Sequence, residues 1–287
     1  MSSLITPEFA VPPDVELFAI GDVHGYAVLL ETLLERIENA PRIPGKRRIV
    51  VFTGDLISRG PASIAAIDLA RTCGKRVQAD AVIGLWGNHE QLLRLSMLHS
   101  DDQRCRSARA LWMEHGGTNV LAELELDSAE GLRAALGAER LAWLNGFKHY
   151  HCEGSVLLVH GGLNPQIRPE PFLEAPIDID IGTLDYDQHW AWIRYTFLRH
   201  VPQDNGKRGH HGFLVVHGHT QGHLDVVTDA AGQLSRDRLN LDGGSYTTGC
   251  VRMVHILSSQ LTLHEARAGQ DFSATPPVDW MGEAVAR

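Results

Sequence analysis

The sequence has few cysteines, no long apolar run and no excess of positive charge, and each absence excludes a class of protein. Only four cysteines occur among 287 residues, and no Cys-x-x-Cys pair is present, which argues against a disulfide framework and a zinc knuckle. No apolar run approaches the roughly 20 residues that span a bilayer. The amino terminus lacks a basic segment followed by an apolar core, so we expect no secretory signal. We therefore expect a cytoplasmic protein with reduced thiols.

The charge balance excludes one kind of partner and constrains another. A net charge of −9 argues against binding to a nucleic-acid polymer, because such binding needs a basic surface that neutralises phosphates. An acidic chain that binds a phosphorylated ligand must instead concentrate positive charge locally, and metal ions can supply it. The composition, with 44% hydrophobic and 21% charged residues, is typical of a globular protein with a sizeable core.

The most informative feature is a set of five apolar runs that each end in a glycine-flanked Asp, Asn or His. The first run is followed by Gly-Asp-Val-His-Gly at 21–25. The others end, in order, in Gly-Asp-Leu-Ile-Ser-Arg-Gly at 54–60, Gly-Asn-His-Glu at 87–90, His-Gly-Gly at 160–162 and Gly-His-Thr at 218–220. In α/β sheets, ligands bind at the carboxyl ends of strands. The pattern therefore predicts that five strand ends converge on one ligand.

The remaining periodicity predicts an α/β protein without internal repeats. Eight apolar stretches read as strands, at 17–20, 48–53, 81–86, 155–159, 213–216, 239–241, 251–256 and 261–264. Helices are expected at 26–40, after Pro61, after the motif at 87–90 and at 189–198, with loops at 165–187 and 202–212. The stretch 100–145 reads as a mostly helical insertion that breaks at Gly116-Gly117. We expect an irregular lead-in at 1–14, a single domain at 15–266 and a tail at 267–287.

The residues at the five run ends form a candidate metal centre. They offer oxygen and imidazole ligands and no thiolate: Asp22, His24, Asp55, Asn88, His160 and His219. Such a set favours Mn²⁺, with Fe or Zn²⁺ as alternatives. Six ligands are too many for one catalytic ion, so we expect two divalent ions bridged by a carboxylate, about 3.5–4 Å apart. Such a pair would bind a phosphate oxygen and activate a bridging water, whose hydroxide attacks phosphorus in line.

Three further residues complete the expected chemistry. The leaving oxygen needs a proton, and His89, beside Asn88, is the candidate donor. The charge that develops on the equatorial oxygens needs a fork of donors, and Arg59 and Arg194 are the candidates. We also expect Asn88 to contact the substrate.

Together and in this order, the five motifs resemble those of the metallophosphoesterases, and more narrowly the bacterial and phage branch of the phosphoprotein phosphatases. Trp-Ile-Arg at 192–194 resembles the Trp-x-Arg segment of that branch, and 239–249 loosely resembles its late Asp-Thr-Gly strand and turn. The resemblance implies a calcineurin-like fold, in which a central β-sandwich of two mixed sheets is flanked by helices. The site would lie at one edge of the sheets.

The resemblance also implies a role for each ligand. Asp22 and His24 would hold the first ion and Asp55 would bridge to the second, which is held by the remaining three ligands, Asn88, His160 and His219. The implied activity is a protein phosphatase that hydrolyses phosphate monoesters on Ser or Thr side chains, with Tyr as a further possibility. The expected partner is thus a phosphoprotein or a small phosphorylated substrate.

One position departs from the protein phosphatases and keeps two alternatives open. Ser58 stands where those enzymes usually have an aspartate that pairs with the catalytic histidine. A serine supplies no charge, so we expect His89 to be a weaker acid, which favours good leaving groups such as phosphoanhydrides. The symmetrical diadenosine tetraphosphate hydrolases also lack this aspartate and often show Arg-Gly-Pro, as at 59–61. A dinucleoside polyphosphate or other nucleotide hydrolase is therefore the first alternative. A binding scaffold without activity is a separate alternative, against which the intact ligand set argues.

Overall fold

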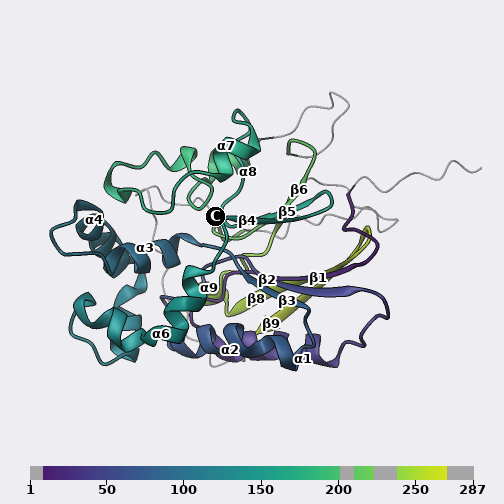
Figure 1. Ribbon diagram of the computed structural model, residues 1–287, viewed down its shortest axis with the longest axis horizontal. Coiled ribbons are helices and arrows are strands. Elements are labelled where there is room, and N and C mark those ends of the chain that lie inside the picture. Colours follow the sequence, from purple (N-terminus) through teal and green to yellow (C-terminus); the bar gives the residue numbers. More distant parts are fainter. Residues whose placement is uncertain (1–8, 201–209, 223–237, 270–287) are drawn as a thin grey trace, which may run out of the picture.

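Two β-sheets packed face to face form the centre of the protein (Figure 1). The computed structural model describes residues 9–200, 210–222 and 238–269. The larger sheet has the strand order β3-β2-β1-β8-β9. Its strands are β1 (Val15–Ile20), β2 (Arg47–Phe52), β3 (Ala81–Gly84), β8 (Cys250–Leu257) and β9 (Gln260–Arg267). The first three strands are parallel, whereas β8 is antiparallel to both β1 and β9.

The second sheet has the strand order β4-β5-β6-β7. Its strands are β4 (Tyr150–Glu153), β5 (Val156–Val159), β6 (Leu214–His217) and β7 (Arg238–Asn240). β5, β6 and β7 are parallel, and β4 pairs antiparallel with β5. Both sheets are therefore mixed, which confirms the predicted sandwich of two mixed sheets.

The first strand shows why these apolar runs form strands that are covered on both faces. Successive side chains of a strand point to opposite faces, and all six side chains of β1 are buried, so both faces of this strand are covered. Leu17 belongs to the core between the sheets together with Leu158 of β5. Phe18 and Ile20 belong to the core that the helices form on the outer face.

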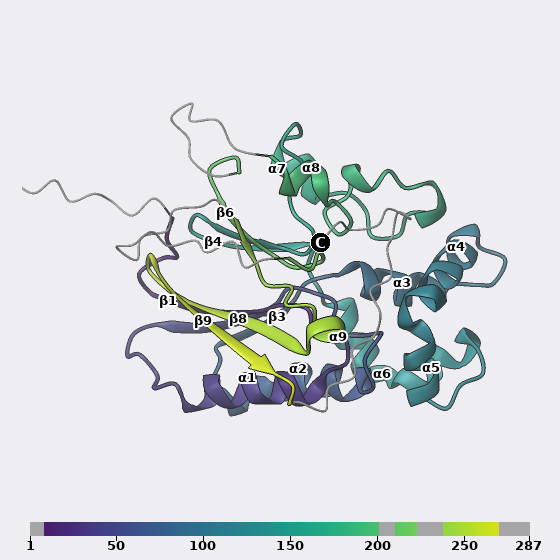
Figure 2. The same ribbon diagram turned by 180° about the vertical axis from the view of Figure 1, so that it is seen from behind.

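Helices cover the outer faces of the sandwich (Figures 1 and 2). α1 (Ala27–Asn39) and α2 (Ser63–Arg76) lie against the five-stranded sheet, and each buries an apolar stripe. α7 (Pro169–Leu173) and α8 (Tyr195–Leu198) lie beside the four-stranded sheet. A short helix, α9 (Ser245–Thr248), precedes β8. No helix within the described ranges is long and apolar enough to cross a bilayer.

The stretch 100–145 is mostly helical, as predicted, and lies with α3 (Asn88–Ser96) at one end of the sheets (Figure 2). It contains α4 (Gln103–Trp112), α5 (Thr118–Glu123) and α6 (Leu132–Asn145). A single turn of π-helix at Met113–Gly117 joins α4 to α5, and the expected break falls there, since Gly116 has a φ of 88°.

Three elements differ from the predictions. The predicted helix at 189–198 is limited to α8, because the carbonyls of Trp190 and Trp192 accept hydrogen bonds from Gly161 and His219 instead of from the next helical turn. The expected loop at 165–187 contains α7. Strand β4 was not expected, because it lies at a sheet edge and only alternate residues are partly covered.

Parts of the predicted organisation lie outside the described residues. These are positions 1–8 of the lead-in, 202–209 of the polar loop and 270–287 of the tail. The assignment of 15–266 to a single domain stays a prediction.

Candidate metal centre

The ends of the predicted apolar runs come together between the two sheets. His160, after β5, bonds through Nδ1 to the carbonyl of Thr53, which follows β2, at 2.8 Å. The amide of His219, two residues beyond β6, donates to Asp22 Oδ2, which follows β1, at 2.9 Å. Residues up to 197 positions apart in sequence therefore meet at this edge, as the sequence pattern predicts.

Asp55 lies at the centre of two groups of potential ligands. In the first group, Asp55, His160 and His219 each offer a ligand atom within 4.8 Å of the others. His160 Nε2 lies 3.3 Å from Asp55 Oδ1 and 3.0 Å from Asn88 Oδ1. His219 Nδ1 lies 2.8 Å from the same Asn88 oxygen. These four side chains are those that the resemblance implies for the bridge and the second ion.

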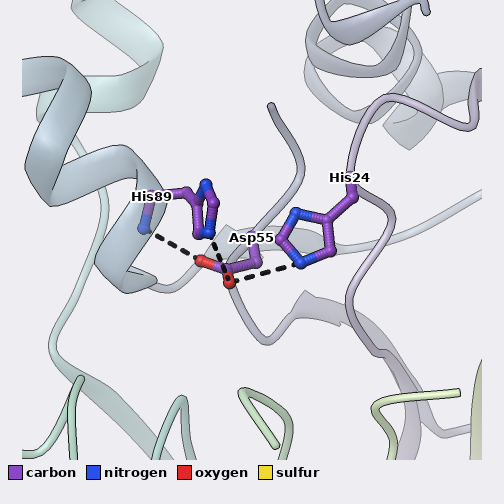
Figure 3. Close-up of side chains that lie close together, drawn as sticks. All are labelled: His24, Asp55 and His89. Atoms are coloured by element: carbon purple, nitrogen blue, oxygen red, sulfur yellow. Dashed lines mark hydrogen bonds and ion pairs between the residues drawn. The ribbon is translucent and has the colours of Figure 1, made fainter. Parts of the chain in front are cut away.

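The second group consists of His24, Asp55 and His89 (Figure 3). The two imidazoles lie on either side of the carboxylate, with His24 Nε2 3.6 Å and His89 Nε2 3.9 Å from Asp55 Oδ2. The backbone amide of His89 donates to Asp55 Oδ1 at 3.1 Å. Asp22, expected here, belongs to neither group among the described residues, although its carboxylate accepts from the His219 amide. The assignment of His89 as proton donor stays a prediction.

Each of the three expected imidazole ligands is oriented by a backbone carbonyl. His24 Nδ1 faces Ile57 O, His160 Nδ1 faces Thr53 O, and His219 Nε2 faces Trp192 O, at 2.8–3.1 Å. A carbonyl oxygen only accepts, so each of these ring nitrogens carries the proton. The opposite nitrogen then points toward the oxygens of Asp55 or Asn88. This is the arrangement in which proteins present histidine to a metal ion.

Burial disfavours the charged form of two carboxylates of the site, those of Asp22 and Asp242. Burial, together with Asp242, raises the pKa of Asp22 well above its usual value, and Asp22 Oδ1 is buried without a hydrogen-bond partner. Burial also raises the pKa of Asp242. Burial would lower the pKa of His160, but Asp55 outweighs it and brings the value to about 9. A field that attracts a proton so strongly also attracts divalent cations, so these residues fit the predicted ions.

The other histidines of the site stay neutral in this environment. Burial, followed by the charge of Arg59, lowers the pKa of His24 to about 3. Burial also lowers the pKa of His89 well below its usual value, and that of His219 likewise, the latter with a further contribution from Arg194. Neutral imidazoles are the form that binds metal ions.

The two predicted arginines lie beside these groups. Arg59 Nη2 is 3.4 Å from His89 Nε2, and the Arg59 guanidinium stacks over the ring of Tyr246 at 3.9 Å. Arg194 donates through Nη1 to His219 O at 3.0 Å and to Thr220 Oγ1 at 2.9 Å. The structure therefore brings both guanidinium groups to the site from different segments of the chain.

The backbone of the site is held in an unusual conformation. Five of its non-glycine residues have positive φ, a conformation in which side chains other than glycine are strained. They are His24, Asp55, Ser58, Arg59 and His219, with φ between 46° and 73°. Gly218 is needed for a different reason, because a Cβ at this position would overlap Asp22 Oδ1.

Sequence reasoning missed two side chains of the site and assigned a third to capping or orientation rather than to metal binding. Asp242 and Tyr246 were read only as part of a strand and turn, although Asp-Gly-Gly after an apolar run repeats the pattern of the other run ends. The Tyr246 ring also packs edge-on against His24 at 5.2 Å. The third residue, Glu90, accepts hydrogen bonds from the backbone amides of Asp55, Leu56 and Gly87 and thus supports the site without joining a ligand group.

The chain is similar in sequence to several known proteins. The calcineurin-like phosphoesterase family matches residues 16–254. A symmetrical bis(5'-nucleosyl)-tetraphosphatase of Methylococcus capsulatus is 35% identical over 149 residues, which cover 52% of this chain and 44% of that protein. Serine/threonine-protein phosphatase 1 of Salmonella typhimurium is 29% identical over 132 residues, covering 45% of this chain and 51% of its own. The chain thus spans about half the length of these relatives.

Similarity to a solved structure extends over most of the chain. The cold-active protein-tyrosine phosphatase of a Shewanella species superposes with a TM-score of 0.55 at 16% identity. The match covers 91% of this chain and 84% of that one. At this identity the similarity concerns the fold alone.

Proposed function

The chain belongs to the calcineurin-like phosphoesterase family, and on this premise we propose that it is a metal-dependent phosphoesterase whose substrate is a dinucleoside tetraphosphate. Attack by water at the central anhydride would give two nucleoside diphosphates. Symmetrical bis(5'-nucleosyl)-tetraphosphatases among the relatives support this substrate over the phosphoprotein that the sequence alone favoured. The alternative interpretation of the sequence is therefore preferred to its main one.

The observation that carries the choice of substrate is the surroundings of Ser58. Its side chain is fully buried, and its hydroxyl accepts a hydrogen bond from Trp112 Nε1 at 2.9 Å. A neutral hydroxyl that is already engaged cannot stabilise an imidazolium at His89, and burial lowers the pKa of His89 further. The leaving group should then depart without full protonation. A nucleoside diphosphate does so readily, whereas the alkoxide of serine does not.

The residues of the site have distinct roles in this proposal. Asp22, His24, Asp55, Asn88, His160 and His219 would hold two divalent cations, which supply positive charge to a phosphate oxygen and acidify water. Arg59 and Arg194 would bind the oxygens of the phosphoryl group as charge changes during transfer. Asp55 belongs to both groups of ligands, and its backbone amide donates to Glu90. It would therefore fix the position of the two groups relative to each other.

A protein phosphatase remains the second candidate, because the Salmonella relative carries that name. The two activities are separated by assaying the Mn²⁺-loaded protein on diadenosine tetraphosphate and on a phosphoserine peptide at matched concentration. We expect a higher kcat/KM on the dinucleotide, with ADP as the sole nucleotide product. A preference for the phosphopeptide would overturn the proposed substrate.

A second assay tests whether the protein is an enzyme at all. Turnover of p-nitrophenyl phosphate is measured with and without Mn²⁺, for the wild type and for His89→Asn. Absence of metal-dependent turnover, with the variant indistinguishable from the wild type, would support a binding scaffold instead.

A further inference from the structure

We propose that the helical insertion positions Arg59, so that Trp112, Gly116 and Asn119 are positioning residues of the phosphate site. This inference rests on the proposed function of Arg59 in binding phosphate. It assigns a role to the end of α4 and the start of α5, for which neither the motifs nor the comparisons provide one.

Three contacts join this part of the insertion to the turn that carries Arg59. Trp112 Nε1 donates to Ser58 Oγ at 2.9 Å, and both side chains are fully buried. The Arg59 amide donates to the carbonyl of Gly116 at 3.1 Å. Asn119 Nδ2 donates to the carbonyl of Arg59 at 2.6 Å. The backbone of Arg59 is thus bonded on both sides by residues that lie about 60 positions further along the chain.

These contacts matter because the turn is strained. Ser58 and Arg59 have φ values of 73° and 69°, and two consecutive non-glycine residues with positive φ persist only where their surroundings impose it. The side chain of Arg59 leaves this turn toward His89 and Tyr246. If the turn relaxed, the guanidinium would move away from the position in which it faces the ligand groups. The insertion therefore helps to determine where the guanidinium lies.

Gly116 shows that the insertion packs closely against the turn that carries Arg59. It has a φ of 88°, and a Cβ at this position would lie 2.5 Å from the Arg59 nitrogen. Gly137, in α6, supplies a stringent control, since it also has a positive φ of 77° but a Cβ there would meet nothing within 4 Å. Its ψ of 162° lies in a region that only glycine adopts readily, whereas the ψ of Gly116 is 16°. Gly137→Ala therefore carries the larger backbone cost, while only Gly116→Ala displaces Arg59.

The first experiment is a double-mutant cycle on p-nitrophenyl phosphate with Mn²⁺. We expect Trp112→Phe and Asn119→Ala each to lower kcat/KM by about threefold to tenfold, for loss of one hydrogen bond. We expect Gly116→Ala to lower it as well, because the added Cβ displaces Arg59. Inhibition by inorganic phosphate should weaken by a similar factor. In an Arg59→Ala background the same substitutions should have little further effect, because they act through Arg59. An equal loss in both backgrounds would overturn the proposal.

Two controls separate positioning from a general loss of stability. Trp190→Phe removes a comparable buried indole bond, from Nε1 to Ala175 O at 3.0 Å, and should leave kcat/KM nearly unchanged. Gly137→Ala should also leave kcat/KM nearly unchanged. If these controls lower kcat/KM as much as Trp112→Phe and Gly116→Ala, the effect is structural and the proposal fails.

A second experiment needs no catalytic activity. Hydrogen exchange measured by mass spectrometry on the metal-free protein follows the peptide that contains the Arg59 amide. Trp112→Phe and Asn119→Ala should accelerate exchange in that peptide, and Trp190→Phe should not. Unchanged exchange in all variants would overturn the proposal. Accelerated exchange without any turnover in the wild type would uphold the coupling and reject the proposed function instead.

Discussion

Replacing Glu90 by glutamine tests how much of the site depends on one buried carboxylate. Glu90 is 1% exposed, and its Oε2 accepts from the amides of Asp55 at 2.8 Å and Gly87 at 3.1 Å. Its Oε1 accepts from the amide of Leu56 at 2.8 Å. A glutamine offers only one oxygen, so its amide group would face at least one of these donors with a donor of its own.

The expected loss of stability follows from the number of acceptor oxygens that the substitution removes. Leaving one buried donor unsatisfied costs about 1–3 kcal/mol, and the bonds that remain lose the strength that the charge gave them. We therefore expect Glu90→Gln to lower the free energy of unfolding by roughly 2–4 kcal/mol. Because Glu90 holds the backbone of Asp55, we also expect Mn²⁺ affinity to fall by about tenfold or more.

The assay is urea unfolding of the metal-free protein, followed by calorimetric titration with Mn²⁺. Burial, with the charge of Asp55, raises the pKa of Glu90 to about 7, so the comparison is made near pH 8, where the carboxylate is charged. Glu35→Gln, on the exposed face of α1, is the matched control and should change neither quantity. A Glu90→Gln variant as stable as the wild type, with the same affinity for Mn²⁺, would refute the reasoning.

Three further predictions concern charge at buried positions. Ser58→Asp should raise the pKa of His89 and increase kcat more on alkyl than on aryl phosphates, by up to about tenfold; an equal change on both substrates would contradict this. Burial lowers the pKa of His189 from 6.5 to about 4, so its contribution to stability is complete above pH 6.5 and is lost as the pH falls toward 4. His189→Gln should therefore reduce the fall in melting temperature over that range, where His189 accounts for up to about 3 kcal/mol; parallel profiles would argue against it. Adding Mn²⁺ to chelator-treated protein at about 100 times its dissociation constant should stabilise it by about 2.7 kcal/mol, because ions that bind only the folded site shift the unfolding equilibrium toward the native state; an unchanged melting temperature would count against a metal centre.

The convergence of the run ends was predictable because it depends on local patterns. An apolar run that stops at Gly-Asp or His-Gly identifies both a strand and the end that carries the polar residue. Since β1 and β2 are parallel neighbours, and β5 and β6 are as well, the polar residues of each pair necessarily lie at the same edge. The grouping of Asp55 with His160 and His219 also needs the two sheets to pack with these edges together, as the predicted sandwich implies.

The contacts between distant segments could not be predicted in the same way. The bond from Trp112 to Ser58 depends on how the insertion packs, and nothing in the local sequence of either residue indicates the other. The helix expected around Trp190 and Trp192 does not form for a related reason. The carbonyls of these residues accept hydrogen bonds from Gly161 and His219, which are distant in sequence. Periodicity detects neither kind of interaction.

The order in which the ribosome makes the chain has a consequence for loading the site. β1 is central in its sheet, but its partner β8 begins only at Cys250. Asp22 likewise gains its hydrogen bond from the His219 amide only after residue 219 has been synthesised. A nascent chain that has emerged through α6 already contains Asp22, His24 and Asp55. It still lacks His160 and His219, which complete the candidate ligands. An ion that binds at that stage meets an incomplete site, so binding by the full set of ligands requires the later synthesis of His160 and His219.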